Sequence, residues 1–99
     1  MTQKTPEQCH SMAELRVEID QLDRQLIELI AKRTQYIDRA AVLKQSEKLP
    51  ARITSRVEEV VDNVKRLASQ NNLDPQIAET VWRDLIEWSI AKEEQVLGK

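Results

Sequence analysis

A long helical pattern dominates the first half of the sequence. From about Ala13 to Lys44 apolar residues recur at spacings of four, three, four and three, at Leu15, Ile19, Leu22, Leu26 and Leu29. This spacing predicts one amphipathic helix. A helix of roughly 30 residues is a rod of about 45–50 Å, whereas a compact chain of 100 residues has a radius of gyration near 13 Å. The rest of the chain is too small to cover such a rod, so we expect a second copy to pack along it.

Two breaks divide the chain into three predicted helices, which are long, short and long. The first break is Ser46–Ser55, with Pro50 inside it, and the second is Gln70–Asp74, followed by Pro75. Ser55 with Glu58 suggests a capping box, and Asp74 before Pro75 suggests an N-cap and first helical residue. We therefore predict one all-α domain over residues 1–99, with helices at about 13–44, 55–69 and 75–97.

Composition excludes several classes of function. The net charge is −2, so no overall field favours nucleic acid or a membrane surface. Cys9 is the single cysteine, so an internal disulfide is not possible, and beside His10 it is far more typical of a surface thiol than of a metal ligand. With no long apolar run and no apolar leader, we expect a cytoplasmic protein.

Basic residues interrupt the apolar stripe of the first helix. The stripe should continue at position 33, which is Arg33, and it later meets Lys44 on the same face. Charges on an apolar face need a partner, which is either a protein carboxylate or a ligand anion. An interhelical salt bridge is the ordinary explanation. Arg56, at the start of the second helix, favours an anion site instead, because a helix N-terminus also attracts anions.

Arg16 and Glu93 are less informative on their own. Arg16 lies beside the stripe and about 25 Å from Arg33 along one straight helix, so the two could meet only if they came from different chains. Glu93 lies in the charged stretch KEEQ near the C-terminus. Taken alone, Arg16 is an ordinary helix-surface residue and Glu93 a solvated one.

Taken together, these residues resemble a known family. The order Arg16, Arg33, Lys44, Arg56 and an acid or amide at position 93, with the phrase ELRVEIDQLDRQLIELIAKR, is similar to the all-helical chorismate mutases. The segments KTPEQC, NNLD and LIEWSIAKE resemble the isochorismate-pyruvate lyase branch, which serves salicylate and siderophore synthesis. The resemblance runs from about Lys4 to Leu97.

The family implies an intertwined homodimer with two equivalent sites. Arg33 and Arg56 of one chain and Arg16 of the other would bind the carboxylates of chorismate or isochorismate, which are dianions. Lys44 and the residue at position 93 would act on the ether oxygen of the enolpyruvyl bridge. The reactions are pericyclic and need no cofactor, and the loop at 46–55 would close over the site to exclude water.

Three positions depart from the pattern of housekeeping mutases. Val57 stands where they usually carry Glu, which contacts the ring hydroxyl of chorismate, and Ile53 stands where they usually carry Asp. Both substitutions suit the lyase, although Val57 also fits an apolar stripe of its own helix. Glu93 stands where most relatives carry Gln. An ionised carboxylate cannot donate a hydrogen bond, so we expect activity that is highest on the acid side and a flatter pH profile for Glu93→Gln.

The resemblance therefore predicts an isochorismate-pyruvate lyase with secondary chorismate mutase activity. Two alternatives stay open within the same chemistry, which are a chorismate mutase proper and a mutase for an amino analogue of chorismate. A third, from another class, is a helical oligomerisation or regulatory module that has lost the activity.

Overall fold

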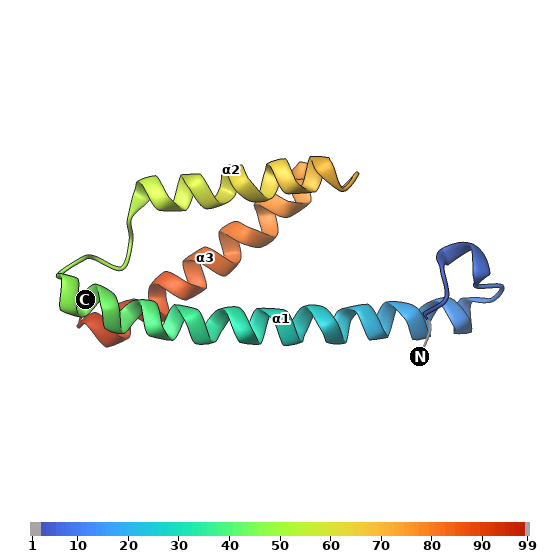
Figure 1. The fold of residues 1–99 in the computed structure, drawn as a ribbon, viewed down its shortest axis with the longest axis horizontal. Helices are drawn as coiled ribbons and strands as arrows, with labels where there is room; N and C mark the ends of the chain where they lie inside the picture. The colour runs from blue at the N-terminus through green and yellow to red at the C-terminus, as the bar shows by residue number, and fades with distance from the viewer. Residues whose placement is uncertain (1–2, 99) are drawn as a thin grey trace. The chain divides into compact units, whose positions relative to one another are not determined.

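The chain folds into three α-helices joined by short connections. The computed structural model describes residues 3–98 (Figure 1), in which a short 3-10 helix, η1 (Pro6–Gln8), precedes α1 (Met12–Glu47), α2 (Thr54–Gln70) and α3 (Pro75–Leu97). The helices have 36, 17 and 23 residues. The prediction of an all-α chain with three helices is confirmed. Within the described residues no helix is both long and apolar enough to span a bilayer.

The chain divides into two compact units, and the boundary between them falls within α1. The N-terminal unit ends at Gln35 and the C-terminal unit begins at Tyr36. In the C-terminal unit, α2 and α3 pack against each other around a core of four buried side chains, Ala51, Val61, Ile86 and Ile90. Val57, Val60 and Leu97 pack against this core. The C-terminal unit therefore has its own apolar interior.

The N-terminal unit is a helix with its apolar side chains exposed. Leu22, Leu26 and Leu29 keep 51%, 55% and 62% of their surface accessible in the single chain. Before the helix, a short segment folds back on its first turn, where Lys4 Nζ lies 3.5 Å from Glu14 Oε2. The backbone N–H of His10 also donates to Glu14 Oε1, at 2.8 Å. The predicted apolar stripe thus exists, but residues 3–98 leave these three leucines of it more than half exposed.

The connection between α1 and α2 is shorter than the sequence suggested, and spans residues 48–53. Lys48 adopts a left-handed conformation with φ 60°, and the N–H of Leu49 donates back to the carbonyl of Lys44 at 2.8 Å. This is the hydrogen-bond pattern that commonly ends a helix, here with Lys where Gly is usual. The turn holds the end of α1 next to the loop.

The two predicted helix starts had different outcomes. Asp74 is the N-cap of α3 and its side chain accepts a hydrogen bond from the N–H of Gln76, so that prediction is confirmed. The predicted N-cap at Ser55 is wrong, because α2 begins one residue earlier and its N-cap is Ile53, which has no capping side chain. Glu58, the expected partner of Ser55, instead pairs with Arg83 on α3.

Candidate active site

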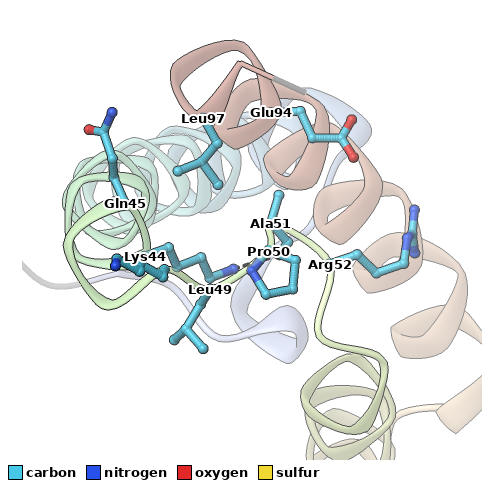
Figure 2. Close-up of a pocket in the computed structure, with 9 residues that line it drawn as sticks. Lys44, Gln45, Leu49, Pro50, Ala51, Arg52, Glu94 and Leu97 are labelled. Atoms are coloured by element: carbon cyan, nitrogen blue, oxygen red, sulfur yellow. Dashed lines mark hydrogen bonds between the residues drawn. The ribbon is translucent and has the colours of Figure 1, made fainter.

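Lys44 is the centre of a small polar cluster in the C-terminal unit. Its ammonium nitrogen lies 2.7 Å from Glu93 Oε1 on α3 and 2.6 Å from the backbone carbonyl oxygen of Ala51. Figure 2 shows the Lys44 side chain reaching from the end of α1 toward the loop at Ala51. A lysine ammonium has three N–H donors, so two are used here and one is left.

The position of Glu93 follows from the buried face of α3. Ile86, Ser89, Ile90 and Glu93 are the buried residues of the second half of this helix, and their spacing of three, one and three places them on one face. Glu93 is only 4% exposed. The interpretation of Glu93 as a solvated residue is therefore wrong. A carboxylate at such a position needs a charged or hydrogen-bonding partner, and Lys44 supplies it.

The ion pair also shows which partner Lys44 has in the structure. The sequence left two possibilities, a protein carboxylate or a ligand anion, and the structure shows the carboxylate. The Lys44 side chain keeps 20% of its surface exposed, whereas that of Glu93 keeps 5%. Lys44 therefore has a fixed partner on its buried side and remains accessible to a small molecule.

A cavity of about 520 Å³ adjoins Lys44 and the loop. It is lined by three cationic side chains, those of Lys44, Lys48 and Arg52, by Glu94, and by neutral residues that include Leu49 and Pro50. Figure 2 shows the loop residues from Leu49 to Arg52 along one side of this cavity and Glu94 and Leu97 of α3 along another. Lys44 is paired with Glu93 and Arg52 with Glu87, so an anionic ligand in this cavity would compete with these carboxylates for the cations.

Arg52 holds the loop to α3. Its guanidinium forms two hydrogen bonds with the Glu87 carboxylate, at 2.9 and 2.6 Å. Hydrogen bonding from Arg52 lowers the pKa of the Glu87 carboxyl below its ordinary value, so this carboxyl is ionised at neutral pH. Neither residue was predicted as part of the site, because nothing in the order of charges along the sequence indicates that positions 35 residues apart meet.

The second helix carries the remaining predicted residues of this unit. Arg56 lies in the first turn of α2, and its exposed side chain pairs with exposed Glu59 at 2.9 Å. Val57 is partly buried and packs against the apolar core. Ile53 is half-buried at the N-cap. Exposed ion pairs contribute little, so Arg56 could leave Glu59 for a ligand at small cost.

Arg16 and Arg33 belong to the N-terminal unit. Arg16 is exposed and Arg33 is half-buried on α1. Among the predicted site residues, the structure thus joins Lys44 directly to Glu93 and adds the Ala51 carbonyl, which no sequence pattern could reveal. Within residues 3–98 no group of three or more His, Cys, Asp and Glu side chains is arranged to hold a metal ion.

The geometry agrees with comparisons to known proteins. The family model described as chorismate mutase type II matches residues 15–94. An isochorismate pyruvate lyase of Pseudomonas aeruginosa is 33% identical over 91 residues, which are 91% of this chain and 88% of that protein. A chorismate mutase of Methanocaldococcus jannaschii is 29% identical over 86 residues, or 87% of each chain. With most of its length matched in this way, the chain belongs to the chorismate mutase type II family.

Proposed function

We propose that this protein is an isochorismate-pyruvate lyase with secondary chorismate mutase activity, working as a homodimer. The observation that carries the proposal is the Lys44 ammonium, which is fixed by Glu93 and the Ala51 carbonyl and keeps one donor free. In both reactions the C–O bond of the enolpyruvyl ether breaks, and negative charge grows on its oxygen. A preorganised cation at that oxygen lowers the barrier.

Arginines supply the rest of the binding energy. Arg33 and Arg56 of one protomer and Arg16 of the second would each take part in binding the two substrate carboxylates, because guanidinium groups pair with carboxylates in a fork geometry. Fixing both carboxylates holds a flexible dianion in the folded conformer that reacts. The exposed apolar side chains of α1 support the dimer, because a second copy would bury them.

Val57 and Ile53 support the lyase over the mutase. Housekeeping mutases usually carry carboxylates at these positions, and here both side chains are apolar and at least half-buried. Val57 is also part of the packing around the core, so its environment is unsuited to a ring hydroxyl. The 33% identity to an isochorismate pyruvate lyase is consistent with this choice.

Glu93 has a role that depends on its proton. As an ionised carboxylate it accepts from Lys44 and directs that ammonium, which is its arrangement in the structure. With a proton it would instead donate to the ether oxygen, as Gln does in relatives. We propose that Glu93 is catalytic through one of these two contacts. A comparison of kcat against pH for the parent and Glu93→Gln separates them, because a proton donor at Glu93 would give a fall in activity with rising pH that Glu93→Gln removes.

A two-substrate assay tests the proposal. Purified protein is offered isochorismate and chorismate, and salicylate, pyruvate and prephenate are followed, with Lys44→Ala as the control. We expect salicylate to form faster than prephenate, and Lys44→Ala to lower kcat at least about 100-fold with a smaller change in KM.

Each of the other possible results of this assay would favour one of the alternative functions. Prephenate without salicylate would make the protein a chorismate mutase proper, and turnover of an amino analogue alone would make it a mutase for that substrate. No turnover of any of the three would leave a helical oligomerisation or regulatory module. A Lys44→Ala variant with normal kcat would remove Lys44 from the chemistry.

A further inference from the structure

The loop between α1 and α2 is held at two neighbouring residues by two different helices. At Ala51 the backbone carbonyl accepts a hydrogen bond from Lys44 of α1 at 2.6 Å. At Arg52 the guanidinium forms two hydrogen bonds with Glu87 of α3, at 2.9 and 2.6 Å. The carbonyl that fixes Lys44 is therefore one peptide unit from a side chain that is tied to α3.

Lys44 depends on this loop for its direction. One of its two partners, Glu93, is on a helix packed into the core, but the other is a backbone oxygen on a six-residue connection. If the loop moved away, the ammonium would keep a single fixed partner and could rotate about its long side chain. A lysine with two fixed partners presents its third N–H in one direction, whereas a lysine with one partner does not.

We propose that Arg52 and Glu87 form a positioning pair for Lys44. Their ion pair holds the loop so that the Ala51 carbonyl stays on the Lys44 ammonium, and it thereby sets the direction of the remaining donor. Neither side chain needs to touch the substrate for this effect. The proposal rests on the proposed function for its catalytic consequence, but its structural part, the ordering of the loop, can be measured without any substrate.

The size of the effect follows from the exposure of the pair. The Arg52 and Glu87 side chains are 46% and 57% exposed, and ion pairs in such surroundings are weak. The pair should therefore shift the ratio of closed to open loop by only about threefold to fivefold. Since Lys44 acts on charge that appears in the transition state, this shift should lower kcat by up to about the same factor and change KM less.

The molecule contains a matched control. Arg83 and Glu58 form a second forked pair between α3 and α2, at 3.4 and 3.2 Å, and Glu58 is 55% exposed. Glu58→Gln and Glu87→Gln thus remove the same charge from equally exposed members of similar pairs. Only Glu87 is linked to the loop that carries Ala51.

The experiment compares Glu87→Gln, Arg52→Ala and Arg52→Lys with Glu58→Gln. For each variant, kcat and KM for isochorismate are measured together with the melting temperature and the amide hydrogen exchange of residues 49–53. We expect Glu87→Gln and Arg52→Ala to lower kcat about threefold, to leave KM within about twofold, and to speed exchange in the loop. Arg52→Lys should recover part of both losses, and Glu58→Gln should change neither.

The double variant Arg52→Glu with Glu87→Arg keeps the proposal testable if a single variant folds poorly. It restores the ion pair with its charges exchanged, so loop exchange and kcat should return toward the parent values. The proposal is overturned if loop exchange in Glu87→Gln equals that in Glu58→Gln, or if both variants lower kcat equally. Should the parent enzyme turn over neither substrate, the proposed function fails, and the exchange data alone still decide whether the pair orders the loop.

Discussion

The two units of this chain bury their apolar side chains in different ways. In the C-terminal unit, Val61 and Ile86 are buried in a core that α2 and α3 form together. In the N-terminal unit, Leu26 and Leu29 follow an equally regular helical pattern and are more than half exposed. The difference shows that the same amphipathic signal in a sequence predicts a helix in both cases but does not say whether its partner is in the same chain.

The residues of the proposed site are also divided between the N-terminal and the C-terminal unit. Lys44 and Glu93 are already in contact within the C-terminal unit, whereas Arg16 and Arg33 lie on the helix with the exposed apolar face. One unit therefore holds the groups proposed to act on the breaking bond, and the other holds cations proposed to bind carboxylates. If a second copy covers the exposed face, folding and completion of the site are one event.

The largest expected effect is complementation between two inactive variants. Arg16→Ala and Arg33→Ala should each lose at least about 100-fold in kcat/KM, because each removes a carboxylate ligand. When the two proteins are unfolded together and refolded in equal amounts, half of the dimers should be mixed. Each mixed dimer has one site with a full set, so activity should return to about a quarter of the parent value.

The control is each variant refolded alone, which should stay inactive. Formation of mixed dimers is checked with a tag on one variant. If mixed dimers form and remain as inactive as their parents, the sites are not shared between protomers, and the division of the site between the two units has no functional meaning.

Next in size is a change of assembly or of stability, depending on the unit. Leu26→Asp places a charge on the exposed apolar face and should convert the proposed homodimer to monomers, as measured by sedimentation equilibrium. Ile86→Ala, in the core of the C-terminal unit, should instead lower the free energy of unfolding by about 2–5 kcal/mol and leave the oligomeric state unchanged. An unchanged mass for Leu26→Asp would contradict the view that this face packs against a second copy.

A smaller effect is expected at Val57, which is part of the packing of the C-terminal unit. Val57→Glu should provide a partner for the ring hydroxyl of chorismate and raise the ratio of mutase to lyase activity about tenfold, the usual effect of one hydrogen bond to a charged group. It should also lower the melting temperature, because a carboxylate enters an apolar contact. Val57→Gln serves as a control for size, and a ratio that stays constant in folded protein would make Val57 a packing residue only.

The smallest effect concerns an ion-pair network on the surface of the same unit. Hydrogen bonds from Arg83 and then Lys65 lower the pKa of the Glu79 carboxyl. A lowered pKa in the folded state means that the unfolded chain binds this proton more readily, so the stabilisation is complete at neutral pH and is lost as pH falls through the folded value. Glu79→Gln should therefore reduce the difference in stability between pH 7 and acid conditions below about pH 4.

Urea unfolding at several pH values measures this change. Glu28→Gln, on the exposed part of α1, is the control and should leave the slope of stability against pH nearly unchanged. Equal slopes for Glu79→Gln and the parent would mean that the network is too well solvated to matter.

Local signals in the sequence predicted local features well. The start of α3 at Asp74 and Pro75 needs only neighbouring residues, and it was predicted correctly. The start of α2 was placed one residue too late. The Ile53 carbonyl already accepts hydrogen bonds from the N–H groups of Arg56 and Val57, and the carboxylate of Glu58 pairs with Arg83 of another helix instead of capping its own. A capping motif is read from neighbouring residues, so it does not show that a residue distant in the sequence binds the same side chain.

The prediction of the site was limited in the same way, because local sequence patterns do not show contacts between distant residues. The sequence identified Lys44 as a charge on an apolar face, and the structure confirms that a carboxylate partner exists. It did not show that Glu93 is buried, because the stretch KEEQ is polar throughout and only one of its residues is buried. The Ala51 carbonyl and the pair of Arg52 and Glu87 depend on the path of the loop, which has no periodicity to read.

The contacts of Lys44 also have a stereochemical consequence. An ammonium nitrogen is tetrahedral, and three of its four directions lead to its own Cε, to the Ala51 oxygen and to Glu93 Oε1. Three fixed directions define the fourth, so an acceptor can approach along a single line. An ether oxygen that binds to Lys44 would have to lie on this line, so the positions of a loop carbonyl and a helix carboxylate would set where the reacting oxygen can be.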